Sequence, residues 1–203
     1  MLCCRFYTAL AGIGGKMPAM PDLLSDLPDT AASALRKRCF APVVDAHTRV
    51  LVLGSLPGDA SLAQQQYYGH KQNAFWRLMA QVTGVDLPAL AYPARLEALA
   101  AAGIGLWDVI AEAERDGSLD TAIRARANND LSALLASLPA LHTIAFNGGT
   151  AARLGRKALA LHPAAWRLVD LPSSSAAHTM AFASKLAAWL ILREAPPSAP
   201  ATA

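Results

Sequence analysis

The stretch Arg49-Val-Leu-Val-Leu-Gly-Ser-Leu-Pro-Gly58 decides the fold class, because its first half predicts a strand and its second half a loop. Residues 49 to 53 combine β-branched and leucine side chains, and glycine, serine and proline then end the run. Short apolar runs bounded by such residues are typical of buried strands. We therefore predict a buried strand whose carboxyl end opens into a loop of small residues.

The same pattern repeats along the rest of the chain. Further strands are predicted at residues 103 to 110, 142 to 146 and 166 to 171. Helices are predicted at residues 73 to 82, 131 to 138, 150 to 161 and 176 to 193, with Asp130 as the cap of the second helix. In the last helix, an apolar stripe contains Met180, Ala183, Ala187, Leu190 and Ile191. Strands that alternate with helices predict a mostly parallel sheet with helices on both faces, an α/β fold.

Length and composition favour one compact domain. Of the 203 residues, 54% are hydrophobic and 16% are charged. We expect a domain at residues 31 to 194, a loose extension at 1 to 30 and a disordered tail at 195 to 203. Three cysteines predict neither an iron–sulfur cluster nor a disulfide framework. We expect a cytoplasmic monomer without cofactor, metal or membrane span, and the net charge of +3 permits a polyanionic partner without requiring one.

Polar groups are predicted to gather where the strands end, since the carboxyl ends of parallel strands form the binding edge of such sheets. The four strand ends carry Gly54-Ser-Leu-Pro-Gly58, Trp107-Asp108, Asn147-Gly-Gly149 and Leu171-Pro-Ser-Ser-Ser175. Dinucleotide, phosphate-loop and nucleophile-elbow signatures all fail here; for example, Asp108 stands where a dinucleotide fingerprint needs glycine. Small, amide and hydroxyl groups, with aromatic residues at 67 to 76, predict a pocket for a neutral, planar, polar ligand.

Seven motifs in register resemble the hypoxanthine-DNA (deoxyinosine) glycosylase branch of the uracil-DNA glycosylase superfamily. They are Gly54-Ser-Leu-Pro-Gly58, Ser61-Leu62, Gln66-Tyr-Tyr-Gly-His70, Asn73-Ala-Phe-Trp76, Leu106-Trp-Asp108, Ala145-Phe-Asn-Gly148 and Leu171-Pro-Ser-Ser-Ser175. This resemblance implies a three-layer α/β/α sandwich with a four-stranded parallel sheet. It also implies hydrolysis of the N-glycosidic bond of a deaminated base (hypoxanthine, or also uracil or xanthine) that is flipped out of DNA.

The resemblance implies that Asn73 holds the hydrolytic water, although an asparagine here is also a good helix cap. Leu56 stands where most other branches carry an aspartate or asparagine that orients the water, which shifts this role to Asn73. The backbone of the loop is then left as a donor surface for the base. The base-binding residues expected from this loop are Gly54, Ser55, Leu56 and Pro57.

Four further residues are expected to contact the base. Tyr68 would stack on it, or else pack in the core, and Phe75 would border the pocket. Asp108 would accept a hydrogen bond from the base edge, such as the N1–H of hypoxanthine, or else only start a helix. Asn147 would contact the base or a phosphate, or else only form a turn.

DNA contacts are expected from Ser61, Ser173, Ser174, Ser175 and His178. The three consecutive serines precede a predicted helix, so they could bind phosphate or only cap that helix. No lysine stands at a position that predicts a Schiff base, which favours a monofunctional glycosylase. The alternatives are a non-catalytic DNA-binding or damage-sensing module on the same fold, and a domain that binds a small nucleotide.

Overall fold

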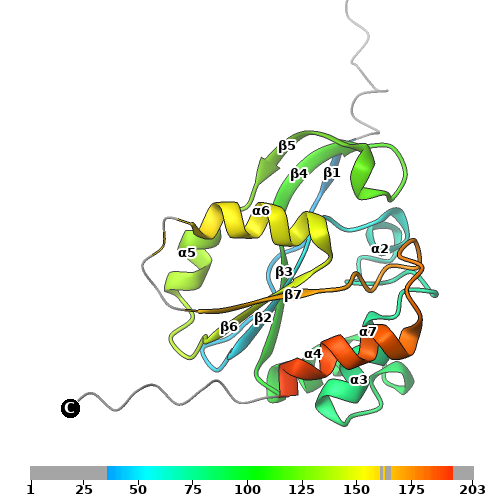
Figure 1. Cartoon of the computed structure of the whole chain (residues 1–203), viewed down its shortest axis with the longest axis vertical. Coiled ribbons are helices and arrows are strands. Elements are labelled where there is room, and N and C mark those ends of the chain that lie inside the picture. Colours follow the sequence, from blue (N-terminus) through cyan, green and yellow to red (C-terminus); the bar gives the residue numbers. More distant parts are fainter. Residues whose placement is uncertain (1–35, 161, 163–165, 194–203) are drawn as a thin grey trace, which may run out of the picture. The chain divides into compact units, whose positions relative to one another are not determined.

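The computed structural model describes residues 36–160, 162 and 166–193 (Figure 1). The predicted extension at residues 1 to 30 and the predicted tail at residues 195 to 203 lie outside these ranges. Residue 161, the last of a predicted helix, also lies outside them.

Four parallel strands form the central sheet. They are β2 (Val50–Gly54), β3 (Ile104–Asp108), β6 (Thr143–Asn147) and β7 (Arg167–Leu171), in the order β3-β2-β6-β7. Each neighbouring pair is parallel, which confirms the predicted sheet. All five residues of β2 are buried, as expected for a central strand covered on both faces.

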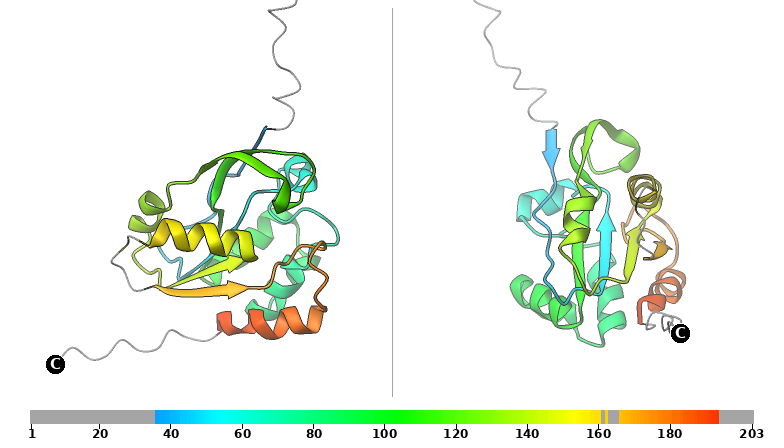
Figure 2. Two further views of the ribbon diagram at one scale, coloured as in Figure 1. Left: turned by 45° about the horizontal axis from the view of Figure 1, so that its top comes forward. Right: turned by 90° about the vertical axis from the view of Figure 1, so that its left-hand side faces the viewer.

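Helices cover both faces of this sheet, as Figure 2 shows. Because side chains alternate along a strand, Val50 and Val52 pack into one core with α3 (Phe75–Thr83), α4 (Tyr92–Ala101) and α7 (Phe182–Trp189). Leu51 and Leu53 pack into the other core with α5 (Leu131–Ala136) and α6 (Gly149–Leu159). The fold is therefore the expected three-layer sandwich. Asp130 caps α5 as predicted, since its Oδ1 accepts a hydrogen bond from Ala133 N at 3.1 Å.

A second, antiparallel sheet was not predicted. It consists of β1 (Arg36–Arg38), β4 (Ile110–Arg115) and β5 (Ile123–Asn128) in the order β1-β4-β5. The predicted strand at residues 103 to 110 instead ends as β3 at Asp108, and the chain continues through Val109 into β4. The turn between β4 and β5 contains a short 3-10 helix, η2 (Asp120–Ala122). This hairpin brings residues 118 to 121 to the binding edge of the parallel sheet.

Three short elements complete the described part of the chain: α2 (Asp59–Gln64), η1 (Leu87–Ala89) and η3 (Leu190–Arg193).

The last helix begins later than predicted, at Phe182 rather than at residue 176. Serine side chains explain the difference, because they offer the backbone N–H groups an alternative to helical bonds. Ser173 Oγ accepts from Ser175 N at 3.2 Å, and Ser175 Oγ accepts from Ala177 N at 3.2 Å. Residues 172 to 181 therefore form a loop, and Met180, expected on the apolar stripe, is 42% exposed.

Candidate active site

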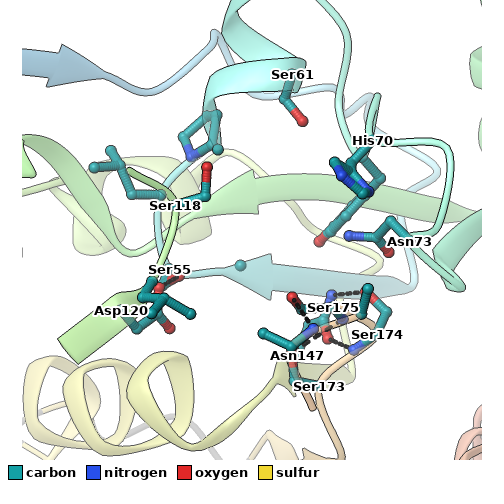
Figure 3. A pocket seen from close by; sticks show the side chains of 18 of the residues that line it. Ser55, Ser61, His70, Asn73, Ser118, Asp120, Asn147, Ser173, Ser174 and Ser175 are labelled. Carbon is teal, nitrogen blue, oxygen red and sulfur yellow. Dashed lines mark hydrogen bonds between the residues drawn. The ribbon is translucent and has the colours of Figure 1, made fainter. Parts of the chain in front are cut away.

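A pocket of about 550 Å³ lies at the carboxyl ends of the four parallel strands (Figure 3). Its volume is within the range typical of small-molecule sites. The structure gathers almost all of the predicted site residues around it: Gly54, Ser55, Leu56, Pro57, Ser61, Tyr68, Asn73, Asp108, Asn147, Ser173, Ser174, Ser175 and His178.

Phe75 is the predicted site residue that does not line this pocket. Its side chain is completely buried, and its ring stacks on the ring of Tyr68 with centroids 3.7 Å apart and an interplanar angle of 15°. The expectation that Phe75 borders the pocket is therefore wrong, because Tyr68 lies between Phe75 and the pocket. Burial, and secondarily the carboxyl group of Asp108, raise the pKa of Tyr68. Tyr68 thus stays a neutral aromatic surface with a second ring behind it.

Asp108 is the most perturbed acid of the site. It ends β3 beside Gly54 of β2 and is only 4% exposed. Burial raises its pKa to about 7; the carboxyl group of Asp120 adds to this, whereas the cation of Arg115 opposes it. Its Oδ2 atom is buried and has no hydrogen-bond partner among the described residues. A buried polar atom without a partner is costly in a folded protein, so this oxygen fits a role in binding a ligand.

Asn73 combines a capping contact with a place in the pocket. Its Oδ1 accepts a hydrogen bond from Phe75 N at 3.0 Å, at the start of α3, although the N-cap position itself is taken by Ala74. Ala74 N donates to Ser174 O at 2.9 Å, which fixes this turn against the serine loop. Within the described part of the chain, the Nδ2 group of Asn73 makes no hydrogen bond and so can bind a pocket ligand or water. The two readings of Asn73 are therefore compatible.

Three predicted contact residues are instead held by hydrogen bonds inside the protein. Asn147 Nδ2 donates to Ser174 Oγ at 2.9 Å, and Ser174 N donates to Asn147 Oδ1 at 2.8 Å (Figure 3). Ser61 is buried, and its Oγ accepts from Gly69 N at 3.0 Å. These side chains tie together the loops around the pocket, which leaves them less capacity for a ligand.

The remaining serines lie on a loop anchored by a buried lysine. Lys185 of α7 is 4% exposed, and its Nζ donates to Ser175 O at 3.0 Å. Burial lowers the pKa of Lys185. Ser173 and Ser175 are half-buried, and His178, further along the same loop, is exposed. The hydrogen bond from Lys185 therefore holds the loop in place, and the hydroxyl groups of Ser173 and Ser175 line the pocket.

Two charged residues of the β4–β5 hairpin belong to the site and were not predicted from the sequence. Arg115 is 1% exposed and donates from Nη1 to Leu56 O at 3.2 Å and from Nη2 to Pro57 O. Asp120 lines the pocket, and its Oδ1 accepts from Ser55 Oγ at 2.7 Å. The alternation of apolar and charged residues at 110 to 115, which is typical of a half-exposed strand, could have indicated the strand that carries Arg115.

Neither a metal centre nor a membrane span emerges from the described residues. No group of three or more His, Cys, Asp or Glu side chains in this part of the chain could hold a metal ion. Likewise, no helix in the same part is long and apolar enough to cross a bilayer. Leu56 is 6% exposed and packs into the core with α5 and α6, so its side chain supplies no polar group to the pocket.

A three-layer sandwich whose parallel strand ends carry a pocket lined by hydroxyl, amide and carboxyl groups agrees with the class of protein that the sequence motifs indicated. The family model for the uracil DNA glycosylase superfamily matches residues 41–193, and the chain belongs to this superfamily.

Relatives and a solved structure agree with this family. The chain is 40% identical over 155 residues to "Hypoxanthine DNA glycosylase" of Methanosarcina barkeri (strain Fusaro / DSM 804). The aligned region covers 76% of this chain and 96% of the relative. A protein of the same name from Methanosarcina acetivorans is 40% identical over 153 residues, with 75% and 95% covered. The solution NMR structure of a candidate uracil DNA glycosylase from Methanosarcina acetivorans matches with a TM-score of 0.70 and 38% identity, covering 78% of this chain and 97% of that one.

Proposed function

We propose that this protein is a DNA glycosylase that hydrolyses the N-glycosidic bond of hypoxanthine, and of related deaminated bases, in DNA. Two relatives named hypoxanthine DNA glycosylase share 40% of their residues with it over nearly their whole length. The observation that carries the proposal is a single pocket that holds both Asn73, with a free amide N–H₂, and Asp108, with an unpartnered buried oxygen. One group can position water and the other can read a base.

Base recognition rests on Tyr68 and Asp108. A base inside a duplex is out of reach, so the damaged nucleotide must rotate into the pocket. Tyr68, with Phe75 stacked behind it, offers an aromatic face to the flipped base. Because the pKa of Asp108 is raised to about 7, its ionised and protonated forms coexist near neutrality. The protonated form can donate to a ring or carbonyl acceptor of hypoxanthine, and the ionised form can accept an N–H of a base.

Asn73 holds the hydrolytic water in this proposal. The reaction is dissociative: the bond between base and sugar breaks first, the base leaves with the bonding electrons, and water captures the oxocarbenium-like sugar. Backbone N–H groups of Ser55, Leu56 and Gly58 stabilise the departing base, in the manner of preorganised donors. Arg115 positions this loop by binding the carbonyl groups of Leu56 and Pro57. None of the described residues that line the pocket is a lysine, which favours a monofunctional enzyme.

We further propose that the enzyme works as a cytoplasmic, nucleoid-associated monomer that contacts DNA through Ser173, Ser175 and His178. All the residues that are given a role in this proposal belong to one chain, so the proposed reaction requires no second copy. Gel filtration with light scattering tests this proposal, and a stable dimer would overturn it.

A panel of oligonucleotides with single lesions tests the activity. The purified protein is incubated with DNA containing hypoxanthine, uracil or xanthine, and alkali then cleaves the abasic sites. We expect cleavage at hypoxanthine after alkali and intact strands without it. Tight lesion binding without release of the base would instead identify a non-catalytic damage-sensing module.

A further inference from the structure

The pocket contains a serine hydroxyl group, that of Ser55, which donates its hydrogen bond to the carboxylate of Asp120. Ser55, at the end of β2, and Asp120, in the β4–β5 hairpin, both line the pocket. The distance from Ser55 Oγ to Asp120 Oδ1 is 2.7 Å (Figure 3). Since an ionised carboxylate only accepts hydrogen bonds, the serine must be the donor. The Ser55 oxygen then has only its lone pairs left for a ligand.

Arg115 contacts both the loop of Ser55 and the side chain of Asp120. Its Nη1 atom lies 3.8 Å from Asp120 Oδ1, and the guanidinium also binds the carbonyl groups of Leu56 and Pro57. One buried cation therefore joins the loop that carries Ser55 to the hairpin that carries Asp120. Asp120 is thereby held where its carboxylate accepts the hydrogen bond that Ser55 donates.

Deamination changes the character of the base at one ring nitrogen. Adenine has a lone pair at N1 and cytosine has one at N3, whereas hypoxanthine carries N1–H and uracil carries N3–H. If a pocket group can only accept a hydrogen bond, it binds the ring N–H of the deaminated base. With the parent base, its lone pair meets the lone pair of the unprotonated ring nitrogen, and no hydrogen bond forms. Leaving such buried polar groups unpaired is an effective way to reject a close analogue.

We propose that Ser55 Oγ, oriented by Asp120, accepts the ring N–H created by deamination and so discriminates deaminated bases from their parents. This inference rests on the proposed glycosylase function and assigns a specificity role to a pair of side chains. Ser55 is the residue that touches the base, and Asp120 is a positioning residue that acts through it.

The experiment measures binding rather than excision. Wild-type protein, Ser55→Ala and Asp120→Asn are titrated with duplexes that carry 2′-fluoro-2′-deoxyinosine or 2′-fluoro-2′-deoxyadenosine, which resist cleavage. An asparagine at 120 can donate its own N–H to Ser55 Oγ and free the hydroxyl proton to turn toward adenine. We expect both variants to lose about fivefold to tenfold of the preference for inosine. The control is Asp116→Asn, an exposed residue of the same hairpin outside the pocket, which should keep the preference.

Folding of each variant is checked by its Tm. If Asp120→Asn does not fold, the inosine preference of Ser55→Ala alone tests the proposal. A folded Ser55→Ala that keeps the wild-type preference overturns the proposal. Loss of preference in Ser55→Ala with full preference in folded Asp120→Asn overturns it as well, since Asp120 then orients nothing. Failure of the proposed function is distinguishable, because the wild-type protein would then leave ordinary deoxyinosine DNA intact.

Discussion

The carboxyl group of Asp108 stands directly over Gly54, so that a Cβ on residue 54 would lie 2.5 Å from Asp108 Oδ1. The two residues are register partners at the ends of β3 and β2. No side chain fits at position 54 unless the carboxyl group moves. The other oxygen of this carboxyl group, Asp108 Oδ2, is buried and has no partner among the described residues.

Asp108→Asn is expected to change lesion preference more than DNA affinity. Asparagine keeps the size of the side chain but cannot exist in the acceptor-only form that fits an N–H of the base. We expect single-turnover excision of hypoxanthine and of uracil to fall by factors that differ about tenfold or more, because the two bases present different polar atoms to residue 108 and lost polar complementarity is costly in discrimination. Equal losses on the two substrates, measured side by side, would remove Asp108 from base recognition.

The same substitution is expected to alter the pH dependence of stability. Burial raises the pKa of Asp108 from 3.8 to about 7, so the folded state binds its proton more tightly than the unfolded state does. Its contribution is therefore fully present below pH 4 and is lost as the pH rises to 7, on the order of 3 kcal/mol. Urea unfolding of wild type and Asp108→Asn between pH 4 and 7.5 measures it. Parallel stability curves would show that Asp108 titrates normally.

The sequence was sufficient for the parallel sheet but not for the second sheet. β2 reads Val-Leu-Val-Leu-Gly and β6 has the apolar centre Ile-Ala-Phe, and such runs predict buried parallel strands. By contrast, β5 reads Ile-Arg-Ala-Arg-Ala-Asn and is almost wholly exposed, so no apolar run indicates it. The pairing of β4 with β5, rather than any local motif, brings Asp120 to the pocket.

The site residues divide in the same way. Asp108 was found because it ends a predicted strand and the ends of parallel strands meet at one edge, whereas Asn73 was found through the family resemblance. That Asn147 and Ser174 bond to each other depends on side-chain geometry that spacing alone does not determine. The predicted roles of these residues in the reaction stay predictions until variants are measured.

Leu119 is expected to help separate the flipped base from the duplex. It lines the pocket and is 57% exposed, the largest exposed fraction among the large apolar side chains of the described residues. Apolar side chains inserted between base steps stabilise unstacked DNA. We expect Leu119→Ala to slow excision from duplex DNA by about tenfold while excision from single strands changes little. Val85→Ala, another exposed apolar residue but outside the pocket, is the control; equal slowing on both substrates would contradict the role of Leu119.

Ser173→Ala combined with Ser175→Ala is expected to weaken binding to every DNA alike. Their hydroxyl groups lie on the loop held by Lys185, and phosphate contacts position a protein without reading sequence. We expect about a tenfold loss of affinity for lesion and undamaged duplexes, measured by fluorescence anisotropy. Ser137→Ala, at the end of α5 and outside the pocket, should bind as wild type does. An unchanged affinity with an altered choice of base would move these serines into base recognition.

Asn73→Ala tests the assignment of the hydrolytic water. Leu56 is buried and offers no polar group, which leaves the amide of Asn73 as the group expected to hold water. We expect single-turnover excision of hypoxanthine to fall by about 10² or more, with little change in DNA affinity. The lost hydrogen bond from Phe75 N complicates this variant, because removing a capping contact destabilises a protein by about 1 kcal/mol.

Asn73→Ser and Asn73→Asp separate the capping contact from catalysis. Both side chains can still accept the hydrogen bond from Phe75 N, but neither has the amide N–H₂ that is free in the described structure. If the amide holds the water, both variants keep the wild-type Tm and DNA affinity, and both excise hypoxanthine slowly. If Asn73→Ser is folded, binds DNA and excises at the wild-type rate, then Asn73 serves only the start of α3 and another group holds the water.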